Sequence, residues 1–210
     1  MPNGFFITGT DTNVGKTVLS SLLCAALKGI YWKPIQTGAS EVTDREAVIA
    51  LAGLDSGEVV PESYVFEDPV SPHLAAQRSG CEISLDKIVL PGVQNSCPLI
   101  VEGAGGVMVP INSHQFMVDL MRHLALPVIL AARSTLGTIN HTLLSLQCLE
   151  SSGIRVQGVV LIGPENPENK HAIECYGNTE VIGQIPPLQR IHREGLQNVF
   201  SRYFNQKAFT

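Results

Sequence analysis

Short apolar runs alternate along the chain with longer segments in which apolar residues recur every three or four positions. The short runs predict strands, and the longer segments predict helices with one buried face. Most of the predicted strands are continuously apolar, which is typical of a parallel sheet covered on both faces. The alternation therefore predicts a three-layer α/β domain with a mostly parallel central sheet.

The predicted strands are Phe5–Thr8, Ile30–Lys33, Pro98–Glu102, Pro127–Ala132, Gly158–Ile162 and Val181–Ile185. The predicted helices are a segment from Val18 to Gly29, then Asp44–Ala52, Phe116–Leu124, Thr138–Ser151 and His192–Asn205. Between them, Glu58–Phe66 is ambiguous, Asp68–His73 is predicted as a Pro-rich loop, and Leu85–Gln94 is compatible with a helix that Pro91 interrupts.

Composition places these elements in a single globular domain over residues 1–210, because 44% of the residues are hydrophobic and 16% are charged. The net charge of −5, without a long Lys or Arg run, argues against a nucleic-acid partner. We expect no membrane association and a cytoplasmic location, because no export signal or membrane span is evident. The five cysteines are scattered without a Cys-x-x-Cys pair, so we expect reduced thiols.

A phosphate-binding loop is the most informative motif. Gly9–Thr17 reads Gly-Thr-Asp-Thr-Asn-Val-Gly-Lys-Thr and lies between a predicted strand and a predicted helix. Backbone N–H groups of such a loop, the positive end of the helix and the cation of Lys16 bind phosphate, while the Thr17 hydroxyl can bind Mg²⁺. Five residues separate Gly9 from Gly15, one more than in the common pattern, so this is a variant P-loop.

Other polar segments follow predicted strands and are expected at the same edge of the sheet. Ligands of open α/β sheets bind beyond the carboxyl ends of the strands. The segments in that position are Gly9–Thr17, Lys33–Gly38, Glu102–Gly106 and Pro186–Leu188. The fold thus predicts one site built from residues distant in sequence.

The residue types at this edge suit a metal and an anion. Thr17, Asp44 and Glu102 supply the oxygen ligands that Mg²⁺ prefers. Lys16 and Lys33 would repel each other unless an anion such as a triphosphate lay between them. Asp44 is also explained by the helix dipole alone, and Lys33 by an ordinary surface position.

Two further features have weaker signals. The block Gly103-Ala104-Gly105-Gly106 lacks side chains beyond Ala, so it could approach a ligand closely or form a nest of N–H groups. His73 and His141 are possible general bases, although a hydrogen-bonded structural role is the simpler interpretation. The sequence shows no Ser-His-Asp set.

The P-loop variant, Lys33-Pro34-Ile35-Gln36-Thr37-Gly38 and Glu102-Gly103-Ala104-Gly105-Gly106 occur in the order found in a known enzyme family. Together with Ser71-Pro72-His73 and Gly183-Gln184-Ile185-Pro186, they closely resemble dethiobiotin synthetase from Phe5 to about Leu188. The resemblance implies a homodimeric enzyme of biotin biosynthesis that uses ATP, Mg²⁺ and CO₂. Its reaction closes a cyclic urea on 7,8-diaminopelargonic acid through a carbamic-phosphoric anhydride.

The resemblance also implies roles for individual residues. Lys33 and Lys16 would be catalytic, Thr37 would contact the substrate, and Thr17, Asp44 and Glu102 would bind Mg²⁺. The implied nucleotide site consists of Asn13, Val14, Gly15, Lys16, Thr17, Val18, Asp44, Glu102, Gly103, Ala104, Gly105, Pro186, Pro187 and Leu188.

The chain departs from the family pattern at Asn13, where many members have Glu, and at Ile162 and Gly163, where members often have Asn and Asp. Two other functions share parts of the pattern. A ParA- or MinD-like ATPase switch would carry an additional Lys where Thr10 and Asp11 stand. An enzyme of the cobyrinic acid amide-forming type would normally add a glutaminase domain, for which this chain has no room.

Overall fold

The strands of the central sheet alternate with helices along the chain, in a computed structural model that describes residues 3–92 and 97–209. The strands are β1 (Gly4–Gly9), β2 (Ile30–Trp32), β4 (Val59–Val60), β6 (Leu99–Gly106), β7 (Val128–Arg133), β8 (Val156–Ile162) and β9 (Val181–Ile185). They lie in the order β4-β2-β6-β1-β7-β8-β9, and every adjacent pair is parallel. β3 (Ile35–Gln36) and β5 (Tyr64–Val65) form a separate parallel pair.

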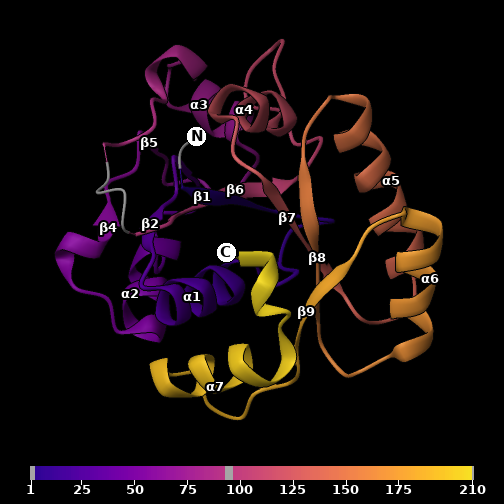
Figure 1. Cartoon of the computed structure of the whole chain (residues 1–210). Coiled ribbons are helices and arrows are strands. Elements are labelled where there is room, and N and C mark those ends of the chain that lie inside the picture. The colour runs from indigo at the N-terminus through magenta and orange to yellow at the C-terminus, as the bar shows by residue number, and fades with distance from the viewer. Residues whose placement is uncertain (1–2, 93–96, 210) are drawn as a thin grey trace.

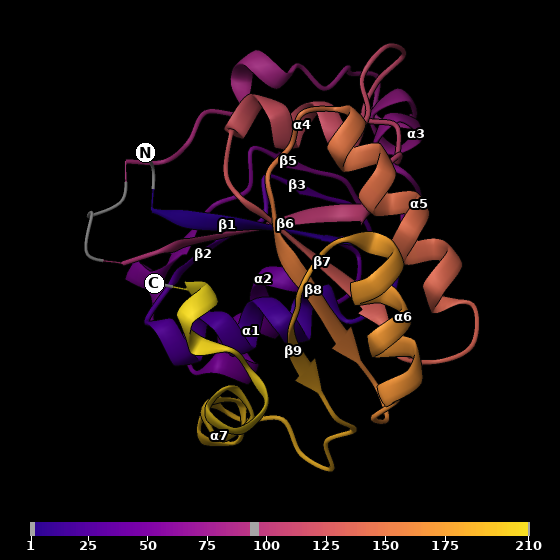
Figure 2. The ribbon, with the colours of Figure 1, turned by 45° about the vertical axis from the view of Figure 1, so that its right-hand side comes forward.

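Helices cover both faces of the sheet (Figures 1 and 2). They are α1 (Lys16–Leu27), α2 (Asp44–Ala52), α3 (Pro72–Arg78), α4 (Met117–Leu124), α5 (Thr138–Ser151), α6 (Pro167–Gly177) and α7 (Arg193–Tyr203). Short 3₁₀ turns occur at Ser56–Glu58, Leu85–Lys87 and Gln206–Phe209. The predicted three-layer α/β fold is therefore confirmed.

The hydrophobic core is divided by the sheet into two clusters. Ile7 of β1 joins Leu19 of α1, Val48 of α2 and Leu196 of α7 on one face. On the other face, the neighbouring strand residue Phe6 belongs to a cluster with side chains of α3, α4, α5 and α6. Because successive strand residues point to opposite faces, each apolar strand supplies both clusters, and its continuous apolar run is required.

The start of α2 is fixed by a capping box at Thr43. The Thr43 hydroxyl accepts a hydrogen bond from Glu46 N at 3.2 Å, and the Glu46 carboxylate accepts one from Thr43 N at 2.8 Å. Such a cap satisfies backbone donors that the first helical turn leaves unpaired. It also fixes the position of Asp44, the first residue of the helix, near the carboxyl ends of the strands.

The Gly-rich block after Glu102 differs from its expected conformation. The sequence predicts that the strand ends at Glu102, whereas β6 continues to Gly106, which pairs with Gly9. Glycine is unfavourable in strands, so propensity alone ends the strand too early. The pairing at Gly9 overrides that preference and ties the block to the start of the phosphate loop.

Three other segments also differ. The sequence predicts a loop over Asp68–His73, but α3 begins at Pro72, where a first helical turn tolerates the missing N–H. A helix over Leu85–Gln94 is wrong for the described part, which forms only the turn Leu85–Lys87; Val93 and Gln94 lie outside the described residues. The ambiguous segment Glu58–Phe66 contains β4 and β5, and α6 has no counterpart in the predicted set.

Candidate functional site

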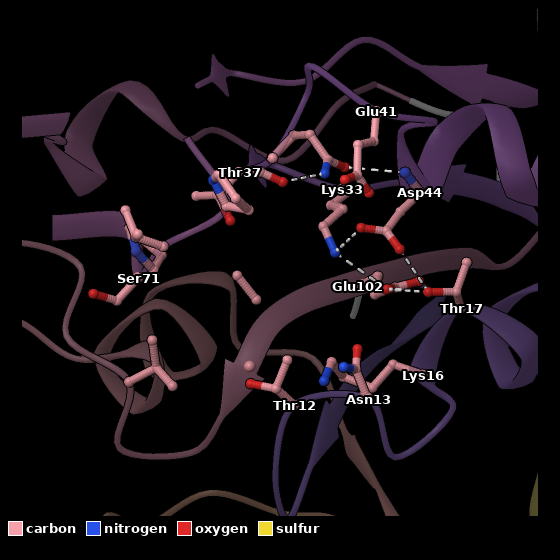
Figure 3. A pocket seen from close by; sticks show the side chains of 18 of the residues that line it. Thr12, Asn13, Lys16, Thr17, Lys33, Thr37, Glu41, Asp44, Ser71 and Glu102 are labelled. Atoms are coloured by element: carbon pink, nitrogen blue, oxygen red, sulfur yellow. Dashed lines mark hydrogen bonds and ion pairs between the residues drawn. The ribbon is translucent and has the colours of Figure 1, made fainter. Parts of the chain in front are cut away.

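A cleft of about 770 Å³ opens beyond the carboxyl ends of the strands. The phosphate loop and the start of α1 form one wall, and the segments after β2 and β3 form another (Figure 3). The predicted site residues that line it are Asn13, Gly15, Lys16, Thr17, Val18, Lys33, Thr37, Asp44, Glu102, Ala104 and Gly105. The parallel topology thus brings together residues from four segments of the sequence.

Asp11 organises the phosphate loop. One of its carboxylate oxygens accepts the backbone N–H of Thr12 at 2.7 Å, and the other accepts Arg133 Nη2 from the end of β7 at 2.7 Å. The backbone oxygen of Asp11 accepts a hydrogen bond from Lys16 Nζ at 3.1 Å. Asp11 therefore holds both the turn of the loop and the position of the Lys16 ammonium.

Gly15 allows the loop to pass close to β8. Its φ of 101° is left-handed, and a Cβ at this position would lie 2.9 Å from Ile162 Cδ1. A side chain would therefore meet both backbone strain and a collision. The side chain of Ile162, at the end of β8, therefore packs directly against the loop at Gly15.

Replacing Gly15 with alanine is expected to destabilise the fold by about 1–3 kcal/mol, because the strained φ is no longer tolerated. Nucleotide affinity should fall as well, since relief of the clash moves backbone donors of the loop. Thermal unfolding and calorimetric titration with ADP measure the two effects. Gly57→Ala is the matched control, because no atom lies within 4 Å of the added Cβ. Equal stability of the two variants would contradict this interpretation.

Three oxygen atoms from distant segments converge on one side of the cleft. Thr17 Oγ1 lies 2.6 Å from Asp44 Oδ1 and 3.1 Å from Glu102 Oε1. A hydroxyl group has a single hydrogen to donate, so only one of these contacts is a hydrogen bond at any moment. Glu102 is 1% exposed, which makes a cationic partner for its charge necessary.

Lys33 supplies that positive charge. Its Nζ lies 2.7 Å from Asp44 Oδ2 and 3.2 Å from Glu102 Oε1 (Figure 3). Burial opposes the charge of Lys33, but the carboxylates of Glu102 and Asp44 outweigh it and raise the pKa of Lys33 above its ordinary value. Burial likewise opposes ionisation of Asp44, while the Lys33 ammonium outweighs it and lowers the pKa of Asp44. Both shifts favour the charged forms of Lys33 and Asp44.

Lys16 has a different environment although it lines the same cleft. Burial lowers the pKa of Lys16, with attraction from Glu102 and repulsion from Lys33 acting in opposite directions. Its ammonium donates a hydrogen bond to the backbone oxygen of Asp11 and not to a carboxylate. Lys16 thus lacks the carboxylate partner that Lys33 has. A bound anion would therefore stabilise the charged form of Lys16 more than that of Lys33.

Tyr31 and Gln36 were not identified from the sequence, yet both hold site residues. The Tyr31 hydroxyl donates to Glu102 Oε2 at 3.1 Å, and burial, followed by Glu102, raises its pKa well above the ordinary value. The buried Gln36 side chain accepts a hydrogen bond from Asp44 N at 3.2 Å. Strand periodicity could have revealed Tyr31, because it lies two positions before Lys33 and so on the same face.

Some predicted residues lie outside the cleft. Val14 is 2% exposed in the core, and a Cβ on Gly103 would lie 2.8 Å from the Phe6 ring. Pro186, Pro187 and Leu188 follow β9, which is three strand spacings from β1, or roughly 14 Å. Their implied contacts to a nucleotide remain predictions, as do the roles of the residues in the cleft.

The two histidines do not point to a general base. His73 Nδ1 lies 3.0 Å from Ser71 Oγ, and His141 is exposed in α5. Neither histidine lines the cleft. Among residues 3–92 and 97–209, no group of three or more His, Cys, Asp and Glu side chains could hold a metal ion. The oxygen cluster in the cleft consists of the Asp44 and Glu102 carboxylates and the Thr17 hydroxyl.

Comparisons with known proteins give the same fold and a specific family. Residues 3–195 match the family model described as AAA domain. The chain is similar to a ParA family ATPase from Chlorobium tepidum (TM-score 0.53, 12% identity, 96% and 92% of the two chains covered). It is also similar to the MinC:MinD complex of Aquifex aeolicus (TM-score 0.55, 15% identity, 93% and 85% covered). These distant likenesses show the fold alone.

Sequence relatives are much closer. The chain is 44% identical over its full length to the ATP-dependent dethiobiotin synthetase BioD of Rhodopseudomonas palustris strain BisB5, covering 98% of that protein. It is 47% identical to the protein of the same name from Lawsonia intracellularis, with 93% of each chain covered. Identity at this level over nearly whole chains shows that the protein belongs to the ATP-dependent dethiobiotin synthetase family.

Proposed function

We propose that the chain converts 7,8-diaminopelargonic acid, CO₂ and ATP into dethiobiotin, ADP and phosphate, as a step of biotin biosynthesis. The observation that carries this proposal is the convergence of Lys16, Lys33, Thr17, Asp44 and Glu102 on a single cleft. That arrangement combines two ammonium groups with oxygen ligands, which ATP-dependent activation of a carboxylated substrate requires.

The oxygen set fits Mg²⁺, which we propose as the metal. The distances of 2.6 and 3.1 Å from Thr17 Oγ1 to the carboxylates bracket the spacing of adjacent ligands on a magnesium octahedron, about 2.9 Å for bonds near 2.05 Å. Thr17, Asp44 and Glu102 would hold the ion, with water and phosphate oxygens completing its shell. When bound, Mg²⁺ neutralises charge on the phosphate oxygens during transfer.

The proposed reaction has three balanced steps. One substrate amine adds to CO₂ to form a carbamate and releases a proton. A carbamate oxygen then attacks the γ-phosphoryl group, and ADP leaves with the electrons of the broken P–O bond. The second amine attacks the carbonyl carbon of the mixed anhydride, phosphate leaves, and loss of a proton completes the cyclic urea. No protein nucleophile takes part in this sequence.

The side chains of the cleft act by positioning and by charge. Lys16 binds the phosphate chain, where the anion restores the charge that burial disfavours. Lys33 stabilises the carbamate and the charge that develops on the transferred phosphoryl group. The two cations also disfavour the ammonium form of the substrate amine, which must be neutral to capture CO₂. Loop N–H groups hold the phosphates in line for transfer.

Thr37 is proposed to contact the diamine, since it lines the cleft wall opposite the phosphate loop (Figure 3). Thr37→Val keeps the side-chain shape and removes the hydroxyl. The KM for 7,8-diaminopelargonate should rise about tenfold through loss of one hydrogen bond, while ADP affinity stays unchanged. Steady-state kinetics with varied diamine checks the first effect. An unaltered KM would remove Thr37 from the substrate site.

We further propose a homodimer in the cytoplasm. Leu136, Leu144 and Tyr176, on and beside α5 and α6, are 101%, 57% and 76% exposed, which favours a covered surface on this side. The mass of the purified chain in solution tests the dimer.

Of the helices that the structure describes, none has the length and apolar character needed to cross a membrane.

The deciding experiment measures phosphate release by the purified chain with ATP and Mg²⁺. Addition of 7,8-diaminopelargonate and bicarbonate together should accelerate release, and mass spectrometry should detect the cyclic urea in equal amount. Hydrolysis that responds only to DNA or to lipid vesicles would instead support an ATPase switch. A response to glutamine would support the amide-forming alternative.

A further inference from the structure

The Lys33 ammonium lies among the oxygens that are proposed to hold Mg²⁺. Its Nζ is 2.7 Å from Asp44 Oδ2 and 3.2 Å from Glu102 Oε1. The same Glu102 oxygen lies 3.1 Å from Thr17 Oγ1. Figure 3 shows these four side chains converging from separate segments. Lysine and the candidate metal ligands therefore share one carboxylate oxygen.

The Lys33 ammonium, in its present place, opposes the binding of a divalent ion to this cluster. Mg²⁺ binds its ligands at about 2.0–2.1 Å, so an ion on Glu102 Oε1 would lie close to the ammonium. The Lys33 and Glu102 side chains are only 6% and 1% exposed, so water screens their charges poorly. Two cations beside one carboxylate oxygen repel each other, and both draw on the charge of Glu102 Oε1.

We propose that Lys33 is a built-in counter-ion of Asp44 and Glu102 that the divalent ion displaces, releasing the Lys33 ammonium into the cleft. Before metal binding, the ammonium offsets part of the negative charge of the two carboxylates and holds them in place. Lys33 lines the cleft together with Thr37, and its flexible four-carbon stem lets the ammonium turn toward that space. The inference rests on the proposed magnesium site and adds an order of events: metal binding precedes the catalytic use of Lys33.

Lys16 provides the contrast that makes the proposal specific. Both lysines line the cleft, but the Lys16 Nζ donates to the backbone oxygen of Asp11 at 3.1 Å. No ion pair of Lys16 with either carboxylate occurs in the described chain. Removing Lys16 therefore deletes one nearby positive charge without freeing a metal ligand.

Binding of Mn²⁺ without nucleotide, measured by electron paramagnetic resonance, tests the displacement. Lys33→Met should bind Mn²⁺ about tenfold more tightly than the unaltered chain or more, because the competing cation is gone. Lys33→Arg should bind as weakly as the unaltered chain. Lys16→Met should change the affinity by less than about threefold, as expected for a more distant charge. Asp44→Asn in the Lys33→Met background should abolish the gain.

Three outcomes would overturn the inference. Equal Mn²⁺ affinity of Lys33→Met and the unaltered chain would show that Lys33 does not compete with the metal, although the metal site itself would stand. Equal gains in Mn²⁺ affinity for Lys33→Met and Lys16→Met would show that only the net charge of the site matters, and not the ion pair of Lys33. An absence of Mn²⁺ binding in every variant, with and without ATP, removes the proposed metal site together with this inference.

A measurement on the unaltered chain keeps the proposal testable if Lys33→Met fails to fold. The ¹⁵Nζ resonance of Lys33, assigned with Lys33→Arg, should shift when Mg²⁺ and adenylyl imidodiphosphate are added together. The same nucleotide with a chelator should leave the resonance near its starting position. A Lys33 resonance that Mg²⁺ does not move would show that the ammonium stays with its carboxylates and would contradict displacement.

Discussion

Replacing Lys33 with methionine is expected to lower kcat by about a thousandfold or more, because one cation that stabilises transition-state charge is lost. Methionine has a similar length, so packing around the 6% exposed side chain changes little. The affinity for ADP should stay within about threefold, since the binding contacts of the loop remain. Phosphate release under saturating substrates gives kcat, and calorimetry gives the ADP affinity.

Lys87→Met is the matched control for this variant, because Lys87 is an exposed lysine in the turn Leu85–Lys87. It should retain full turnover. The stability of Lys33→Met should fall, since the buried Glu102 and the half-buried Asp44 lose their partner, and Mg²⁺ should restore part of it. Turnover of Lys33→Met equal to that of Lys87→Met would remove Lys33 from the catalytic assignment.

The second large effect is expected for Lys16→Met, which should weaken ATP binding by about a hundredfold through loss of charge-assisted contacts to phosphate. Turnover should fall too, because the same cation stabilises the transferred phosphoryl group. In contrast to Lys33→Met, the melting temperature should not fall, because burial already disfavours the Lys16 charge. Calorimetric titrations with ATP analogues and thermal scans measure both properties.

The loss of affinity should be greater for a triphosphate than for AMP, which lacks the outer phosphates. AMP binding is therefore the internal control for Lys16→Met. An equal loss of affinity for the triphosphate and for AMP would indicate a collapsed loop instead of a missing phosphate contact. Unchanged ATP affinity would contradict the role of Lys16.

Much of the fold is predictable from the sequence because its signals are strong and local. The apolar runs that become β1, β7 and β9 are buried on both faces, so sequence and environment agree. α6 escapes prediction because Ile173 is its only fully buried residue, which leaves no apolar stripe. The last half of β6 escapes because its pairing with β1 is a long-range interaction that glycine propensity does not reveal.

The sequence predicts those site residues that directly follow strands, because the strand ends determine where these residues lie. The common edge of parallel strands accounts for Lys33 and Glu102 lying together, 69 residues apart in sequence. The pair Asp11–Arg133 spans 122 residues and has no local signal, so only the structure reveals how the loop is tied to β7. The sequence does not predict the ion pair of Lys33 with the carboxylates either, because it favours an external anion as the partner of the two lysines.

The most direct test of the proposed chemistry follows an oxygen atom from CO₂ into phosphate. The chain is mixed with 7,8-diaminopelargonate, ATP, Mg²⁺ and freshly dissolved ¹⁸O-bicarbonate, and the released phosphate is analysed by mass spectrometry before the label exchanges with water. Attack of a carbamate oxygen on the γ-phosphoryl group predicts one ¹⁸O atom in each phosphate released with product. Phosphate without ¹⁸O, formed together with dethiobiotin, would show that water cleaves ATP and that no carbamic-phosphoric anhydride forms in the cleft.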